Sequence, residues 1–115
     1  MPITPEQVET RLHELGDEID KAHEDLVKSE MVYHKQKAQF EINMSRARLH
    51  VGTNNLKLRV QDVADKALAM CEDDLTNLAI AEATVKAARA NAQRVRTQVD
   101  IARSIGTSVR SALDI

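Results

Sequence analysis

Aromatic residues are almost absent from this chain: Tyr33 and Phe40 are the only two, and there is no tryptophan. Glycine occurs three times and proline twice among 115 residues. A β-sandwich or barrel needs turn residues about every ten positions and β-branched or aromatic side chains to fill its core. The shortage of turn residues and of aromatic side chains excludes those folds. We therefore expect an all-α chain of a few long helices rather than a thick globular core.

Cysteine and long apolar runs are scarce as well. The single cysteine, Cys71, cannot form an internal disulfide and suits a reducing compartment or a buried, inert thiol. No run approaches about 18 apolar residues, and Met1–Glu6 shows no basic region leading into an apolar one. The net charge of −2 excludes a polycation that coats nucleic acid or membrane along its whole surface. We expect a cytoplasmic protein without a membrane partner, located in the bacterial host cytoplasm if it is phage-encoded.

The first helix has a clear start signal. Thr4 reads as the N-cap, Pro5 as the first helical residue and Gln7 as the third, which together form a capping box. Apolar residues then recur at alternating spacings of four and three, a heptad pattern that we call the seam. The seam residues of this first helix, expected over about 4–50, are Val8, Leu12, Leu15, Ile19, Ala22, Leu26, Tyr33, Gln36, Phe40, Asn43 and Ala47.

A turn is expected over 51–55, because Gly52 suits the left-handed position that ends a helix. Residues 56–61 alternate like a strand but also fit a helical face, and without a partner strand we favour helix, with an irregular start up to Asp62 as the alternative. The second helix is thus expected over about 56–112, with Gly106 kinking or ending it. Its seam residues are Leu78, Ala81, Val85, Ala88, Ala92, Val95, Val99, Ala102, Gly106, Val109 and Leu113.

Two long helices joined by a short connection predict one helical domain, 1–115, built as a long antiparallel hairpin. The charge pattern agrees. Net charge is −6 over 1–30, +5 over 31–60, −5 over 61–83 and +4 over 84–115. A fold at residue 53 places position i beside about 106 − i, so opposite blocks meet twice and set the register.

Small residues outside the seam suggest that hairpins associate further. Ala79, Ala83, Ala87 and Ala90 would let another helix approach closely. A lone hairpin buries only one stripe, so we expect a homo-oligomer, either a four-helix bundle or a larger, ring-like bundle.

No pattern in the sequence predicts catalysis. The four histidines form no cluster, and Glu72-Asp73-Asp74 lacks the spacing of a calcium loop and reads as a solvated face or a partner of Lys35 and Lys37. Phosphate-loop, nucleophile-elbow and kinase motifs are missing too. We expect a protein that is not an enzyme, with no metal, no cofactor and no small-molecule substrate.

The region around the expected turn is basic. No acid occurs between Glu41 and Asp62, whereas this stretch holds Arg46, Arg48, Lys57 and Arg59 beside His50. Polar Asn43, Ser45 and Thr53–Asn55 could also reach phosphates. Because no aromatic side chain lies here to stack on bases, the pattern favours sequence-independent contact with a nucleic-acid backbone. A charged turn that only keeps the chain in solution is the alternative.

The layout resembles the UvsY-type recombination mediators and similar small helical proteins of tailed phages. The resemblance rests on Tyr33–Lys35, the basic Arg46–Leu49, a Gly-Asn turn and the final Ile101–Arg110. It implies a non-enzymatic ring oligomer that binds single-stranded DNA and helps a recombinase onto strands covered by single-strand-binding protein. It implies DNA contacts at Arg46, Arg48, Lys57 and Arg59. It also implies an oligomer interface on the last helix, at Val85, Ala88, Ala92, Val95, Val99, Ala102 and Val109.

Two other functions fit the pattern. One is a coiled-coil adaptor or virion-associated protein that binds other proteins and no nucleic acid. The other, ranked third, is a resemblance to WXG-type secreted helical hairpins, from which this chain departs because it has no Trp and no Tyr-containing export signal at its end.

Overall fold

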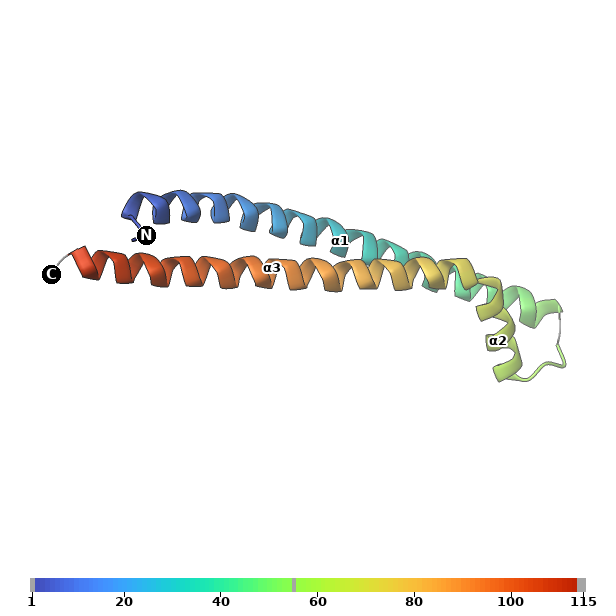
Figure 1. Ribbon diagram of the computed structural model, residues 1–115. Coiled ribbons are helices and arrows are strands. Elements are labelled where there is room, and N and C mark those ends of the chain that lie inside the picture. The colour runs from blue at the N-terminus through green and yellow to red at the C-terminus, as the bar shows by residue number, and fades with distance from the viewer. Residues whose placement is uncertain (1, 55, 114–115) are drawn as a thin grey trace. The chain divides into compact units, whose positions relative to one another are not determined.

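Three helices make up the chain. The computed structural model describes residues 2–54 and 56–113, which form α1 (Pro5–Asn54), α2 (Val60–Met70) and α3 (Glu72–Leu113), with no strand in those two ranges. Helices α1, α2 and α3 follow one another along the chain (Figure 1), which confirms the expected all-α fold built from long helices. The chain divides into two compact units. Unit 1 combines the residues up to Lys28 with those from Lys86 on, and unit 2 is Ser29–Val85.

The start of α1 confirms the predicted capping box. The Thr4 backbone N–H donates to Gln7 Oε1 at 3.0 Å, and the Gln7 N–H donates to Thr4 Oγ1 at 3.2 Å. Pro5 is the first helical residue. Two backbone donors that a helix start leaves unpaired are thereby satisfied, which explains why α1 begins here.

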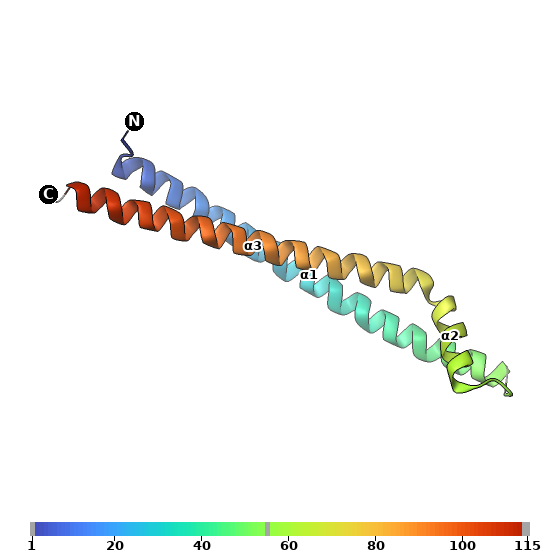
Figure 2. The same cartoon turned by 60° about the horizontal axis from the view of Figure 1, so that its bottom comes forward.

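In unit 1, the first part of α1 lies antiparallel to the last part of α3 (Figures 1 and 2). Ala22, Ala92 and Val95 form a buried cluster with Ile19 against it. The predicted seam is confirmed here, since every seam residue of unit 1 from Val8 to Val109 is buried or half-buried. Leu113 is the exception, because its side chain is exposed.

Gly106 does not kink or end α3, contrary to expectation. The helix continues through it to Leu113, and the glycine is buried against α1. A Cβ placed on Gly106 would lie 2.9 Å from Val8 Cγ1. Glycine at this position therefore allows α1 and α3 to pack closely and does not mark a turn.

In unit 2 the predicted seam residues are also buried or half-buried, and Met44 joins them. Met44, Ala47, Ala67 and Cys71 form the buried cluster, with Phe40 packed against it. Met44 was not assigned to the seam, whereas Asn43 was. Asn43 is half-buried and polar, and its Nδ2 donates to Asp74 Oδ2 at 2.8 Å across the two helices. The expected buried thiol of Cys71 is confirmed.

The expected turn at 51–55 is wrong for the residues that the structure describes, because α1 continues to Asn54. Val51 is buried and extends the row of Met44 and Ala47 at helical spacing. Gly52 keeps a helical backbone with open space around its Cα. Asn54 Nδ2 lies 3.3 Å from His50 Nε2, one helical turn back. Burial of Val51 thus outweighs the helix-breaking tendency of Gly52.

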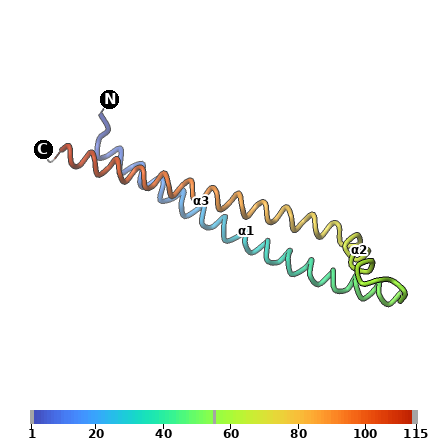
Figure 3. Tube along the Cα trace, turned by 90° about the horizontal axis from the view of Figure 1, so that it is seen from below, coloured from blue at the N-terminus to red at the C-terminus, as the bar shows by residue number. Residues whose placement is uncertain are grey.

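The second helix starts later than the favoured bound, and it is interrupted at Cys71, where no break was expected. Residues 56–59 form a turn and α2 begins only at Val60, after Arg59 with its extended backbone (φ −67°, ψ 154°). At Cys71 the backbone leaves the helical range (φ −105°, ψ 23°), and its N–H is shared by the carbonyls of Ala67 and Leu68. Figures 2 and 3 show α2 at an angle to α3 within unit 2. This bend lets both Ala67 and Cys71 reach α1.

The longer α1 and the added bend shift the register. Val8 meets Gly106 and Asn43 bonds Asp74, so facing positions add up to 114 and 117 rather than 106. Opposite charge blocks still share a unit, since acidic 5–28 and basic 86–113 both lie in unit 1.

Short-range ion pairs also run along α1. Arg11 lies 3.4 Å from Glu14 and 3.8 Å from Glu18, and Lys28 Nζ lies 2.8 Å from Glu24 Oε1. The hydrogen bond and positive charge of Lys28 lower the pKa of Glu24, and the hydrogen bond and negative charge of Glu24 raise the pKa of Lys28. Over the described residues, no helix is both long and apolar enough to cross a membrane.

Candidate nucleic-acid interface

The four predicted basic residues lie at one end of unit 2, and we call them the basic tip. Arg46 and Arg48 belong to the last turns of α1, while Lys57 and Arg59 belong to the connection to α2. All four side chains are exposed. The fold therefore places these four cations on both sides of one connection, where they add to one another's electrostatic potential.

The four cations do not share one face. Arg46 and Arg48 are two residues apart on a helix, so they leave α1 at directions about 200° apart. Lys57 and Arg59 follow in the turn that leads into α2. Contacts made by the basic tip would be distributed around the end of unit 2 rather than lined up in a groove.

Arg48 shares a concave surface with two acidic residues that are not adjacent to it in the sequence. A concave surface of about 500 Å³ between α1 and α2 is lined by Arg48 together with Glu41 and Asp65. The Asp65 carboxylate also accepts a hydrogen bond from Gln61 Nε2 at 2.9 Å. The stretch between Glu41 and Asp62 contains no acid in the sequence, but α2 folds back beside α1 and brings Asp65 close to it in space.

Polar groups near the tip are partly engaged elsewhere. Asn43, expected among the phosphate contacts, is bonded to Asp74. His50 and Asn54 bond each other. Asn55 lies outside the described residues. The charged side chains remain the principal candidates for phosphate contact.

Sequence reasoning missed the apolar side of the tip. Leu56 and Val60 are each 89% exposed, and Leu49 is exposed as well. The alternation from Leu56 to Val60 was interpreted as secondary structure that would bury one face. Because residues 56–59 form a turn instead, Leu56 and Val60 stay exposed, and their aliphatic side chains lie between the cations in the sequence.

The acidic run at Glu72–Asp74 has a structural explanation. It occupies the first turn of α3, where negative charge is favoured by the helix dipole. Asp74 is the partner of Asn43. All four histidines are exposed, and within residues 2–54 and 56–113 no three His, Cys, Asp or Glu side chains are grouped to hold a metal ion.

The residues predicted to form an oligomer interface take part in packing within the chain. Val85, Ala92, Val95 and Ala102 are buried, and the remaining members, Ala88, Val99 and Val109, are half-buried. They form the seam that packs α3 on α1 within each unit. An oligomer interface on these residues stays a prediction.

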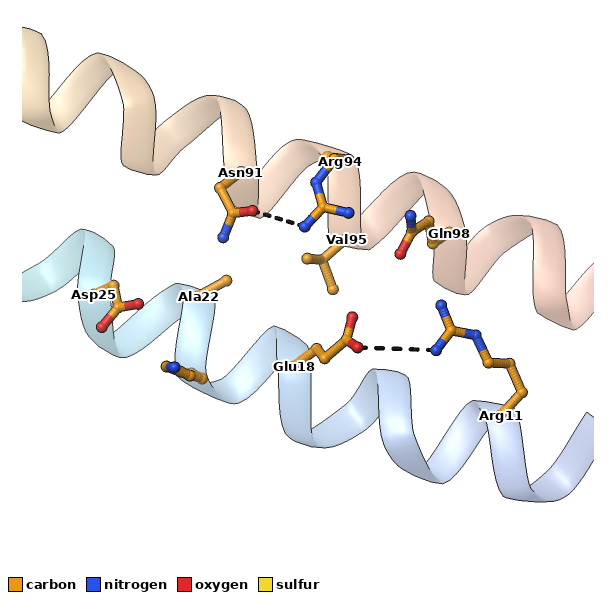
Figure 4. A pocket seen from close by; sticks show the side chains of 9 residues that line it. Arg11, Glu18, Ala22, Asp25, Asn91, Arg94, Val95 and Gln98 are labelled. Atoms are coloured by element: carbon orange, nitrogen blue, oxygen red, sulfur yellow. Dashed lines mark hydrogen bonds and ion pairs between the residues drawn. The ribbon is translucent and has the colours of Figure 1, made fainter.

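A second concave surface lies in unit 1, with a volume of about 300 Å³ (Figure 4). Arg11, Lys21 and Arg94 line it, but so do Glu18 and Asp25. Two of these cations already have partners. Arg11 forms an ion pair with Glu18, and Arg94 Nη2 donates a hydrogen bond to Asn91 Oδ1 at 2.9 Å. A lining of both signs does not select phosphate, which favours the basic tip as the nucleic-acid interface.

Comparison with protein-family models, with curated proteins and with solved structures finds no match to this chain. The interface is therefore argued from its residues and their placement.

Proposed function

We propose that this protein is a non-enzymatic, oligomeric accessory factor of DNA recombination that binds single-stranded DNA through the basic tip. The observation that carries the proposal is the exposure of Arg46, Arg48, Lys57 and Arg59 around one end of unit 2. Guanidinium and ammonium groups placed in this way bind phosphates and release their counterions, whatever the base sequence.

The spread of the cations favours a single strand over a duplex. Arg46 and Arg48 leave α1 on different sides, so one strand must bend around the tip to reach both. A single strand bends over a few nucleotides, whereas a duplex is stiff over about 150 base pairs. The exposed Leu56 and Val60 would also meet unstacked bases rather than a closed helix.

Four contacts per chain give weak, salt-sensitive binding, so the proposal includes several tips in one assembly. The recombination role and a phage origin rest on the resemblance to UvsY-type mediators. That resemblance suggests a recombinase or a single-strand-binding protein as further partners.

The test is fluorescence anisotropy with a labelled single strand at about 50 and 200 mM salt. We expect binding that weakens steeply with salt, with a logarithmic slope of about −0.7 for each phosphate contact. The Arg46→Glu/Arg48→Glu variant should lose most of the binding. Arg96→Glu/Arg103→Glu, an equal charge change on exposed positions of unit 1, is the matched control and should bind far better. No binding at low salt, or equal losses in both variants, would reject the basic tip.

A protein-binding adaptor or virion component is the second candidate function. The exposed apolar residues Met31, Ile42 and Leu49 favour it, because such side chains on one helix commonly mark a protein interface. Under this function the tip substitutions leave partner binding unchanged.

A further inference from the structure

A second apolar row follows α1 through unit 2. Met31, Ala38, Ile42 and Leu49 are separated by seven, four and seven residues, so they lie on one side of the helix. Ile42 is two residues beyond the seam residue Phe40, which places the row about 200° around the helix from the seam. All four side chains are exposed, Met31 by 67% and Leu49 by 71%. We call these four residues the outer face of α1.

The part of α3 in unit 2 has a comparable row, Leu75, Ala79, Ile80 and Ala83, which we call the outer face of α3. Ala79, Ala83 and Ile80 lie about 100°, 140° and 200° around the helix from the seam residue Leu78, and Leu75 lies about 60° from it. All four are exposed. Leu75 and Ile80 are the large members, and the two alanines lie between them on the helix surface. A neighbouring helix can therefore approach α3 closely here.

The charges on the two segments determine which faces can meet. Residues 31–49 carry four basic groups and one acid, a net charge of +3. Residues 72–83 carry four acids and no basic group, a net charge of −4. Pairing α1 with α1, or α3 with α3, places like charges together. Pairing the outer face of α1 with the outer face of α3 places opposite charges together.

The two outer faces point in opposite directions. The outer face of α1 lies on the far side of its helix from the seam, as do Ile80 and Ala83 of α3, and the seam is where the two helices of unit 2 pack on each other. A second copy that lies against α1 therefore leaves the outer face of α3 uncovered. Covering both faces requires two neighbours, one on each side.

We propose that the outer face of α1 is the docking site for the outer face of α3 of a second copy of this chain. The interface joins two different surfaces, so it is head-to-tail, and copies add until a ring of three or more closes or a filament forms. This inference rests on the oligomer of the proposed function and assigns its contacts. It needs no DNA, although Arg46 and Arg48 contribute both to the positive charge of residues 31–49 and to the basic tip.

The test uses two variants, each with one face blocked. Met31→Glu/Ile42→Glu places acids on the outer face of α1, opposite the acids of α3. Ile80→Gln/Ala83→Gln places bulky polar groups on the outer face of α3. All four positions are exposed, so each variant should keep its helix content by circular dichroism. Val32→Glu, at an exposed apolar residue off the outer face, is the matched control.

Masses are measured by light scattering without DNA. We expect three or more chains in the assembly of the unaltered protein and of Val32→Glu, and a single chain for each blocked variant. An equal mixture of the two blocked variants should form a dimer, because each supplies the face that the other lacks. A mixture that stays monomeric, or a blocked variant that keeps the original mass, would overturn the proposal.

The same samples separate this inference from the proposed function. If the masses follow the expected order but single-stranded DNA does not bind, the interface stands and the DNA-binding role falls. If a single-chain form of the unaltered protein binds DNA through the basic tip, the role stands and the interface falls.

Discussion

The side of α1 that faces away from the seam differs between the two units. In unit 1 it is polar and charged, with Glu6, His13, Asp17 and Glu24 exposed at helical spacing. In unit 2 the corresponding side is the apolar row from Met31 to Leu49. The seam runs along both. Unit 1 therefore presents a hydrophilic surface on this side of α1, whereas unit 2 exposes apolar side chains whose burial would be favourable.

The two units also pack differently inside. Unit 1 is a two-helix contact in which Leu15 and Val95 are fully buried and Ala22, Ala92 and Gly106 allow a close approach. In unit 2 the buried cluster joins Met44 and Ala47 of α1 to Ala67 of α2 and Cys71, so it involves a third helix. Truncations in the two units should therefore act separately, and the predictions below test this, from the largest effect to the smallest.

The largest effect is expected for Leu15→Ala in unit 1. Leu15 is fully buried, so truncation should cost about 2 to 4 kcal/mol of unfolding free energy through lost transfer energy and the cavity left behind. Amide hydrogen exchange should accelerate mainly in 86–113, and Met44→Ala should instead act on 72–85. Ile101→Ala, at an exposed position of α3, is the control. Equal acceleration across both units for each variant would show one cooperative unit and remove the comparison.

Asn43→Ala in unit 2 should come next. It removes a half-buried amide–carboxylate hydrogen bond of 2.8 Å and leaves Asp74 without it, at a cost of about 1 to 3 kcal/mol. Chemical denaturation monitored by circular dichroism measures the loss. Asp74→Asn can still accept a hydrogen bond and should lose less. If Asn43→Ala were neutral, the bend at Cys71 would be held by the apolar cluster alone.

The smallest effects are expected for two glycines of unit 1, with opposite signs. Gly16→Ala meets nothing within 4 Å and should stabilise the helix by up to about 1 kcal/mol. Gly106→Ala gains the same propensity, but its Cβ meets Val8 Cγ1, and overpacking of this kind costs about 1 to 3 kcal/mol. Its melting temperature should therefore fall.

Val8→Ala combined with Gly106→Ala tests the cause of that fall. The valine is stiff about its χ1 and yields little, so truncating it should recover part of the loss. Stability of Gly106→Ala equal to that of Gly16→Ala would mean that the helices separate easily at this end of unit 1.

The start of α1 and most of the seam were predictable because their causes are local. Thr4 and Gln7 are three residues apart, and seam positions follow from the helical period alone. The break at Gly52 was predicted wrongly because burial of Val51, a tertiary contact, outweighs the local preference. No glycine or proline lies near Cys71 in the sequence, so the local sequence does not predict the bend there.

The candidate site divides in the same way. Exposure of Arg46, Arg48, Lys57 and Arg59 was predictable, because charged side chains beside a connection remain in water. Placing Asp65 beside Arg48 and bonding Asn43 to Asp74 required the angle of α2. The interface predicted on Val85 to Val109 stays a prediction, and the structure adds that α1 packs against this stripe within the chain.

By itself, the sequence determined that this chain is helical, where its first helix begins and which stripe joins the two long helices. These depend on residue spacing and on composition, which act over one or two turns. Only the tertiary structure decided the register, the bend at Cys71 and the apolar outer faces of unit 2. Those depend on which residues separated by tens of positions bury each other, and a helical period fixes the face of a helix but not what lies against it.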